Sequence, residues 1–182
     1  MKKHASTFAF IDSQNLNLGV RTVGWKLDFV KFRRFLNDTY HVEKAYLFIG
    51  QMPENQKLYF YLQNAGYILV FKPTQHYFKY GKKATKGNVD AELVLHSAAR
   101  LFKDYDEAVI VSGDGDFLCL YEYLEENNKL KKILVHNKNK YSKLLKPFVH
   151  KIDYISTKKT KLEQKNDRHF LERRTLQGSL SW

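Results

Sequence analysis

Cysteine is almost missing from this 182-residue sequence, in which Cys119 is the only thiol. One cysteine cannot form an intrachain disulfide or supply the cysteine pairs of a zinc finger, so disulfide-rich and cysteine-based zinc proteins are excluded. Because Cys119 lies in the apolar run FLCLYEYL, it is expected to be a small core residue. This cysteine usage fits a reducing, cytoplasmic setting.

Long apolar runs are also missing. No stretch approaches the roughly 20 apolar residues that a membrane-spanning helix needs. The first residues, MKKHASTFAFID, carry two lysines, but their apolar run is short and ends at Asp12, unlike the core of a secretory signal. We therefore expect a cytoplasmic protein that has no membrane partner.

Acidic residues are scarce relative to basic ones, since 19 Asp and Glu face 31 Lys and Arg, giving a formal net charge of +12. Such an excess points to a polyanionic partner, nucleic acid first and an anionic membrane surface second. The plainer alternative is a basic protein that is merely soluble. With 43% hydrophobic residues, a sizeable core is expected, in a single domain over residues 1–156. Residues 157–182 look like a polar, basic tail that docks on this domain or on a partner.

Strand-like and helix-like segments alternate along the domain. Short apolar segments typical of buried strands are 7–11, 44–50, 67–71, 108–113 and 131–136, with 151–155 as a sixth candidate. The helical candidates are 26–38, 54–66, 89–102, 116–128 and 141–149. This order predicts a three-layer α/β/α fold with a mostly parallel sheet of five or six strands. Sites in such sheets gather at the carboxyl ends of the strands.

Carboxylates stand where this fold class predicts a site. Asp12 follows the first predicted strand, and Asp114 and Asp116 follow the fourth. If these strands are neighbours, their ends lie about 5 Å apart. Asp90 shares the apolar face of its predicted helix, where a carboxylate is costly unless something satisfies it. Glu92 lies on the opposite face and should meet solvent together with His96.

Each of these residues also has a purely structural explanation. Asp114 or Asp116 could cap the following helix, Asp12 and Asn15 could shape a turn, and Asp90 could favour its helix dipole. Together, the four aspartates would repel one another strongly without a cation. Hard oxygen ligands favour Mg²⁺ or Mn²⁺, and carboxylate-held Mg²⁺ in a basic protein suggests phosphate-ester chemistry. The predicted metal ligands are Asp12, Asp90, Asp114 and Asp116.

Three motifs in chain order, FIDSQNL, KGNVDAEL and VSGDGDF, resemble the NYN domains of the LabA-like group within the PIN-like nuclease superfamily. The resemblance covers roughly residues 6–155 and implies a three-layer α/β/α, PIN-like fold and metal-dependent cleavage of RNA. The family's catalytic positions map onto Asp12, Asn15, Asp90, Asp114 and Asp116. Ser13 stands where the family commonly has glycine and Gly115 where it commonly has serine, and neither change removes a carboxylate. Some similar domains are known chiefly as regulators or RNA-binding parts.

Two segments carry lysines and no acid, with five lysines in residues 72–86 and seven in residues 129–146. Lysines meet phosphates while aromatic side chains stack on bases, which favours RNA as the partner. A hairpin or loop whose aromatic residues pack on the core is the structural alternative for 72–86. The predicted RNA-binding residues are Lys83, Lys86, Lys138, Lys140, Tyr77 and Tyr80. Ser112 is expected to support the acidic site through a hydrogen bond.

The leading functional hypothesis is therefore a Mg²⁺- or Mn²⁺-dependent ribonuclease. The alternative is a non-catalytic RNA-binding module of the same fold. A phosphatase of the haloacid dehalogenase type is disfavoured, because that chemistry needs an acid at position 14, where Gln14 stands. RNA is the expected partner, and a homodimer would lengthen the basic groove.

Overall fold

A computed structural model describes residues 5–73, 75–79, 82–86 and 89–164, with side chains for 5–72 and 89–164. The main sheet has six strands. These are β1 (Thr7–Asp12), β2 (Val42–Gln51), β3 (Tyr67–Pro73), β6 (Glu107–Val111), β7 (Leu130–Val135) and β8 (Ile152–Tyr154). Every predicted strand is therefore confirmed, including the sixth candidate. Their apolar sequences fit the burial of β1, β6 and β7 on both faces.

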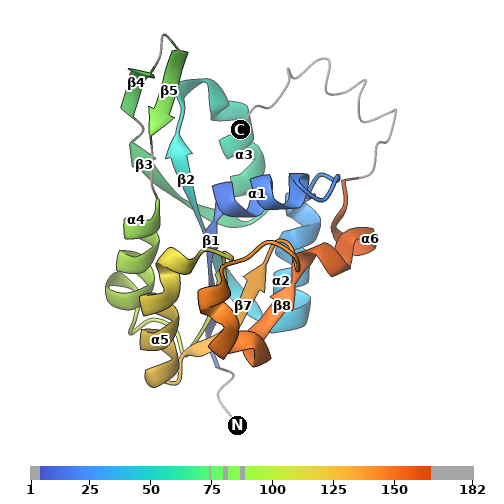
Figure 1. Cartoon of the computed structure of the whole chain (residues 1–182), viewed down its shortest axis with the longest axis vertical. Coiled ribbons are helices and arrows are strands. Elements are labelled where there is room, and N and C mark those ends of the chain that lie inside the picture. The colour runs from blue at the N-terminus through green and yellow to red at the C-terminus, as the bar shows by residue number, and fades with distance from the viewer. Residues whose placement is uncertain (1–4, 74, 80–81, 87–88, 165–182) are drawn as a thin grey trace.

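All neighbouring strands of this sheet run parallel, in the order β3-β2-β1-β6-β7-β8 (Figure 1). From β1, the next two strands, β2 and β3, are added on one side. The chain then crosses back, and β6, β7 and β8 are added on the other side of β1. The strand order thus reverses between β1 and β6, where Ile11 is paired with Val111. This reversal is the point at which open parallel sheets hold their ligands.

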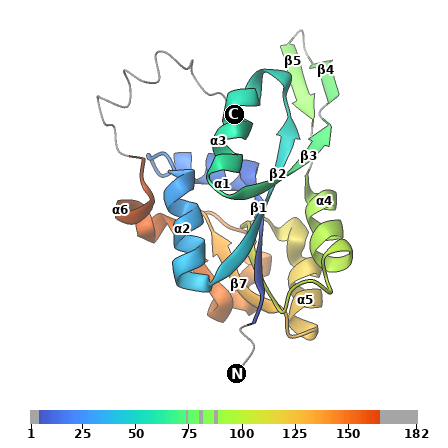
Figure 2. The ribbon, with the colours of Figure 1, turned by 180° about the vertical axis from the view of Figure 1, so that it is seen from behind.

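Helices cover both faces of the sheet. One face carries α1 (Ser13–Arg21), α2 (Phe29–Tyr40), α3 (Gln56–Asn64) and α6 (Lys159–Leu162), and the other carries α4 (Asp90–Leu95) and α5 (Leu118–Glu126). In Figures 1 and 2, α4 and α5 lie together on one side of the sheet and α2 lies on the other. The three-layer α/β/α fold predicted from the sequence is therefore confirmed.

Short helical turns complete the two layers. They are the 3₁₀ segments η1 (Pro53–Asn55), η3 (Gly115–Phe117), η4 (Lys143–Lys151) and η5 (Ile155–Lys158), and the π-helical η2 (His96–Arg100). The predicted helix 141–149 is thus a 3₁₀ helix that contains Pro147, a residue without a backbone N–H donor. The predicted helix 89–102 is divided into α4 and η2. At this junction Ser97 donates its hydroxyl to the carbonyl of Leu93 at 2.7 Å.

Two further features of the fold differ from the sequence-based expectations. Helix α1 was not predicted, because Gly19 and two asparagines give Ser13–Arg21 a low helix propensity. Cys119 is exposed, so its assignment to the core was wrong. It occupies the second position of α5, whose buried residues are Leu120, Tyr121 and Leu124.

The segment 72–86 contains an antiparallel hairpin of β4 (Gln75–Lys79) and β5 (Lys82–Lys86). The alternative that its aromatic side chains pack on the core falls on side chains outside the described residues. Figure 1 places the hairpin beyond the carboxyl end of β2, next to β3. Residues 157–164 pack on the domain, since Leu162 is buried and its carbonyl accepts from the N–H of Asp28. In the part of the chain that the structure describes, no helix could span a bilayer.

Candidate active site at the strand-order reversal

Asp12 is the most deeply buried acid of the candidate site, with 5% of its surface exposed. It ends β1 and caps α1, because its Oδ1 accepts the backbone N–H of Asn15 at 3.0 Å. The pKa of Asp12 is raised to about 6, mainly by burial and in smaller part by the negative charges of Asp90 and Asp114, while the N–H groups of Asn15 and Gln14 act in the opposite direction. The site thus places Asp12, a carboxylate largely shielded from water, within reach of the charges of two further acids.

Asp90 belongs to a different element, the helix α4. It is half-buried and begins α4, and Leu93 and Ser97 on the same helical face are fully buried. This is the core-facing placement that the sequence predicted. Because α4 packs against β1, the first and second acidic motifs lie near each other, and the charge of Asp90 contributes to the raised pKa of Asp12.

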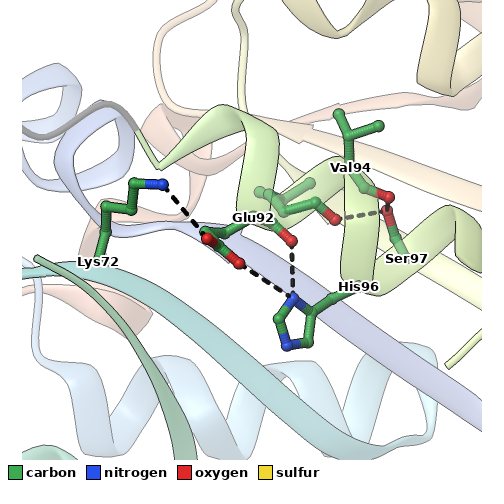
Figure 3. A network of polar contacts seen from close by, with 6 residues as sticks. Lys72, Glu92, Val94, His96 and Ser97 are labelled. Carbon is green, nitrogen blue, oxygen red and sulfur yellow. Dashed lines mark hydrogen bonds and ion pairs between the residues drawn. The ribbon is translucent and has the colours of Figure 1, made fainter. Parts of the chain in front are cut away.

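A polar clamp, the ion pair of Lys72 at the end of β3 with Glu92 of α4, ties α4 to the sheet, with Nζ of Lys72 3.3 Å from Oε1 of Glu92 (Figure 3). Within the helical segment, Nδ1 of His96 lies 2.8 Å from the Glu92 carbonyl oxygen. The imidazole of His96 also packs edge-on against Phe48, with ring centroids 5.5 Å apart. The expectation that Glu92 and His96 simply meet solvent was wrong, because both face the sheet side of the helix and make these contacts.

The third acidic motif forms a tight turn after β6. Asp114 accepts the backbone N–H of Asp116 at 3.1 Å, while its own N–H donates to Oγ of Ser112 at 3.2 Å. Ser112 is buried and its carbonyl accepts the hydroxyl of Tyr121 at 3.1 Å. The side chain of Asp114 is half-buried and that of Asp116 is exposed. Ser112 therefore supports the backbone of the turn, through the N–H of Asp114.

The close approach of the Ser142 side chain to the backbone explains why position 115 is a glycine. A Cβ atom there would lie 2.4 Å from Oγ of Ser142, which caps η4. The turn is further tied to this region by the N–H of Ser142, which donates to the carbonyl of Gly113 at 3.0 Å. The segment that follows β7 thus packs directly against the acidic turn.

Asn15 and His136 form a contact that the sequence-based prediction missed. Oδ1 of Asn15 lies 2.9 Å from Nδ1 of His136 and accepts the N–H of Gly113 at 3.2 Å. Burial lowers the pKa of His136 below its ordinary value, although a hydrogen bond with the backbone of Lys140 acts against this shift. His136 follows β7 directly, so the strand-end rule that selected Asp12 could have found it.

Asn15, Asp114, Asp116 and His136 line an open cleft of about 430 Å³, whereas Asp12 and Asp90 are not among its described lining residues. The lining also includes Lys140, Tyr141, Ser142 and Leu144. Carboxylates and a lysine therefore face the same space. Such a cleft can hold an anionic group beside the acids only if a cation or hydrogen-bond donors offset the repulsion.

A family model for the NYN domain matches residues 6–155, which is most of the chain. The chain belongs to the NYN domain family. This confirms the NYN part of the resemblance, and NYN domains belong to the PIN-like nuclease superfamily. No curated protein matches the chain.

The NYN fold of this chain is similar to a solved structure of a protein of unknown function from Vibrio parahaemolyticus. The two share 24% sequence identity and superpose with a TM-score of 0.65, covering 85% of this chain and 96% of the other. This likeness supports the fold.

The donor set of this NYN domain suits a hard cation. Among residues 5–72 and 89–164, no group of three or more His, Cys, Asp or Glu side chains is arranged to hold a metal ion. Mg²⁺, however, keeps several waters and commonly takes only one or two protein carboxylates. The charge of Asp114 already raises the pKa of Asp12, so a cation between these two residues would relieve an existing repulsion.

The predicted RNA-binding residues fall into two groups. Lys140 lines the cleft, and Lys138 is exposed on the same segment. Lys83, Lys86 and Tyr77 belong to the hairpin, but their side chains, like the whole of Tyr80, lie outside the described residues.

Lysines at the amino end of β7 have acidic or carbonyl partners. Lys131 pairs with Glu107, Lys132 lies 3.8 Å from Asp153, and Nζ of Lys129 donates to the carbonyl of Tyr105. The lysines that follow β7 are therefore better placed to meet phosphates.

Proposed function

We propose that this NYN domain is a member of the LabA-like group and a Mg²⁺- or Mn²⁺-dependent ribonuclease that hydrolyses phosphodiester bonds. One observation carries the proposal: Asp12 lies at the reversal of strand order, where burial first, and the charges of Asp90 and Asp114 in addition, raise its pKa to about 6. Perturbed carboxylates of this kind are typical of catalytic sites.

The acidic residues would together hold the ion. Asp12, Asp90, Asp114 and Asp116 are the proposed ligands. When bound, the ion would polarise the phosphate and lower the pKa of a water molecule. The chain itself fixes Asp12 through the N–H of Asn15 and fixes Asp114 through the hydroxyl of Ser112.

The basic residues would hold the RNA. Lys140 in the cleft and Lys138 beside it would meet phosphates, and the hairpin would add Lys83 and Lys86, with Tyr77 and Tyr80 stacking on bases. The net charge of +12 supports a long contact with the backbone. A cytoplasmic location and a homodimer stay predictions.

A second candidate is an RNA-binding module that retains the acidic cluster without cutting. It is favoured by the finding that, over the described side chains, no three potential ligands are arranged for a metal ion. Such a module would bind RNA with an affinity that falls as salt rises, but it would show no turnover with any divalent ion.

The deciding experiment incubates purified protein with mixed RNA in Mn²⁺, Mg²⁺ or EDTA. Cleavage with the divalent ions, its loss in EDTA and its loss in Asp114→Asn support the ribonuclease. Asp38→Asn is the matched control, because Asp38 is an exposed aspartate of α2, remote from the acidic cluster. RNA binding without turnover supports the second candidate, and equal cleavage by Asp114→Asn and unmodified protein would refute the site.

A further inference from the structure

The side-chain amide of Asn15 has a fixed orientation. Its Oδ1 faces the backbone N–H of Gly113 at 3.2 Å, and a backbone N–H can only donate. The atom facing Gly113 must therefore be the oxygen, and not the amide nitrogen. Nδ1 of His136 contacts the same oxygen at 2.9 Å, so this ring nitrogen must carry a proton.

His136 is itself held by close packing. Its ring lies so near α1 that a Cβ atom at Gly19 would be 2.1 Å from the imidazole carbons. The ring thus occupies the space that any larger residue at position 19 would need. Because Gly19 weakens the helix, we attribute its presence to this contact. The imidazole of His136 therefore packs between α1 and the turn that begins at Gly113.

The hydrogen-bonding groups of the Asn15 side chain that are still available are on its amide nitrogen, Nδ2. Both acceptor positions of Oδ1 are used by the N–H groups of Gly113 and His136, which leaves the two donors of Nδ2 for other partners. Asn15 also lines the cleft beside Asp114 and Lys140. What Asn15 can present to a ligand is therefore a hydrogen-bond donor, which suits an anionic oxygen.

We propose that His136 is a positioning residue that orients the Asn15 amide, so that Nδ2 of Asn15 donates to a phosphate oxygen of RNA bound in the cleft. This inference rests on the proposed function for the identity of the ligand. It assigns Asn15 a role different from that of the aspartates: it binds the phosphate and does not coordinate the metal ion. Beside the acids Asp114 and Asp116, such a donor offsets part of their repulsion of the phosphate.

The orientation can be tested without RNA or metal. Proton–nitrogen correlation spectra of histidine-labelled protein at pH 7.5 distinguish a protonated Nδ1 from a protonated Nε2. We expect His136 to carry its proton on Nδ1, and Asn15→Ala to remove this preference. A proton on Nε2 of His136 in the unmodified protein would overturn the proposed orientation.

The positioning role is tested by substitutions that keep or remove the donor. In His136→Asn the side-chain NH₂ can take the place of Nδ1–H, whereas His136→Leu fills similar space without a donor. We expect RNA affinity to fall about 10-fold in His136→Leu and to recover largely in His136→Asn. Gly19→Ala should behave like His136→Leu, and Leu18→Ala, exposed on the same helix, should bind as unmodified protein does. Equal RNA affinity of His136→Leu and unmodified protein would overturn the positioning role.

The donor role is tested with Asn15→Asp, whose carboxylate can still accept from Gly113 and His136 but has no N–H. We expect the dissociation constant for RNA, measured in EDTA, to rise about 10- to 100-fold. Gln14→Glu adds the same charge on an exposed neighbour and controls for general repulsion. Unchanged affinity in Asn15→Asp would overturn the donor role.

Comparing RNA binding with RNA cleavage distinguishes a failure of this inference from a failure of the proposed function. If the unmodified protein binds RNA but never cuts it, the ribonuclease proposal fails, while weaker binding by Asn15→Asp still supports the donor role. If the unmodified protein does not bind RNA, the donor role fails together with the function. The histidine spectra report the orientation in either case.

Discussion

The backbone N–H of Asn15 donates to Oδ1 of Asp12 at 3.0 Å, so the residue that caps helix α1 is also the most buried acid of the candidate site. One carboxylate therefore serves two purposes. As a cap it stabilises the helix, whereas as a charge it is destabilised by burial and by Asp90 and Asp114. Fold stability and site chemistry are linked at this residue.

We predict that Asp12→Asn makes the protein more stable at pH 7.5. Asparagine caps helices as well as aspartate does, and it has no charge to bury. The pKa of Asp12 rises from 3.8 to about 6 in the folded protein. Between these values the folded state binds more protons than the unfolded state, so the Asp12 contribution to stability falls as pH rises. The expected gain of Asp12→Asn at pH 7.5 is about 1–3 kcal/mol.

Urea unfolding at pH 7.5 and pH 4 checks this prediction. The difference between Asp12→Asn and unmodified protein should shrink at pH 4, because Asp12 is then protonated in the folded protein. Asp38→Asn, which changes an exposed aspartate, should leave the free energy of unfolding almost unchanged at both values. A less stable Asp12→Asn at pH 7.5 would contradict the prediction.

Divalent ions should stabilise the folded protein in a pH-dependent way. Mg²⁺ or Mn²⁺ at Asp12 and Asp114 favours the ionised carboxylates, so protons compete with the metal ion near the raised pKa of Asp12. Millimolar Mn²⁺ is expected to raise Tm more at pH 7.5 than at pH 5, and to raise it little in Asp114→Asn. Thermal unfolding at constant ionic strength measures both effects, and an equal rise in Asp114→Asn would contradict them.

We predict that the pairing of Lys72 with Glu92, and not the charge of either residue alone, holds α4 in place. Both side chains are partly exposed, at 35% and 27%, so the pair is worth only about 0.5–1 kcal/mol. Lys72→Glu places two acids together and should loosen α4, which lowers cleavage because Asp90 begins this helix. The exchange Lys72→Glu with Glu92→Lys should restore both stability and cleavage. Urea unfolding of both single variants and the double variant gives the coupling, and strictly additive effects would argue against the clamp.

Residues 157–164 are expected to contribute to the stability of the domain. Leu162 is 1% exposed and packs with the residues of α2, and Nζ of Lys31 donates to the carbonyl of Glu163 at 2.8 Å. Leu162→Ala should lower the free energy of unfolding by about 2–4 kcal/mol. Lys161→Ala, at an exposed neighbour, should change it little. If Leu162→Ala changed the free energy of unfolding as little as Lys161→Ala, the segment would not contribute packing to the domain.

The strands and the acidic motifs could be predicted because their signals are local. A continuous apolar run marks a strand buried on both faces, and a parallel sheet brings strand ends to one edge. These two rules place Asp12 and Asp114 at the same edge of the sheet, and the structure adds that their strands β1 and β6 are neighbours. Helix α1 could not be predicted, because its Asp12 cap and its packing outweigh the low propensity of Gly19. Cys119 was misplaced because an apolar run does not show which side of a helix meets solvent.

The sequence by itself determined a three-layer α/β/α domain, an excess of positive charge and acids at the ends of two strands, since each depends on composition or on spacing along the chain. Only the tertiary structure decided that His136 meets Asn15, that Glu92 is clamped by Lys72 and that Lys140 faces the acidic turn. These contacts join residues far apart in sequence. Their distances depend on how loops and helix ends pack, and local sequence patterns do not encode that packing.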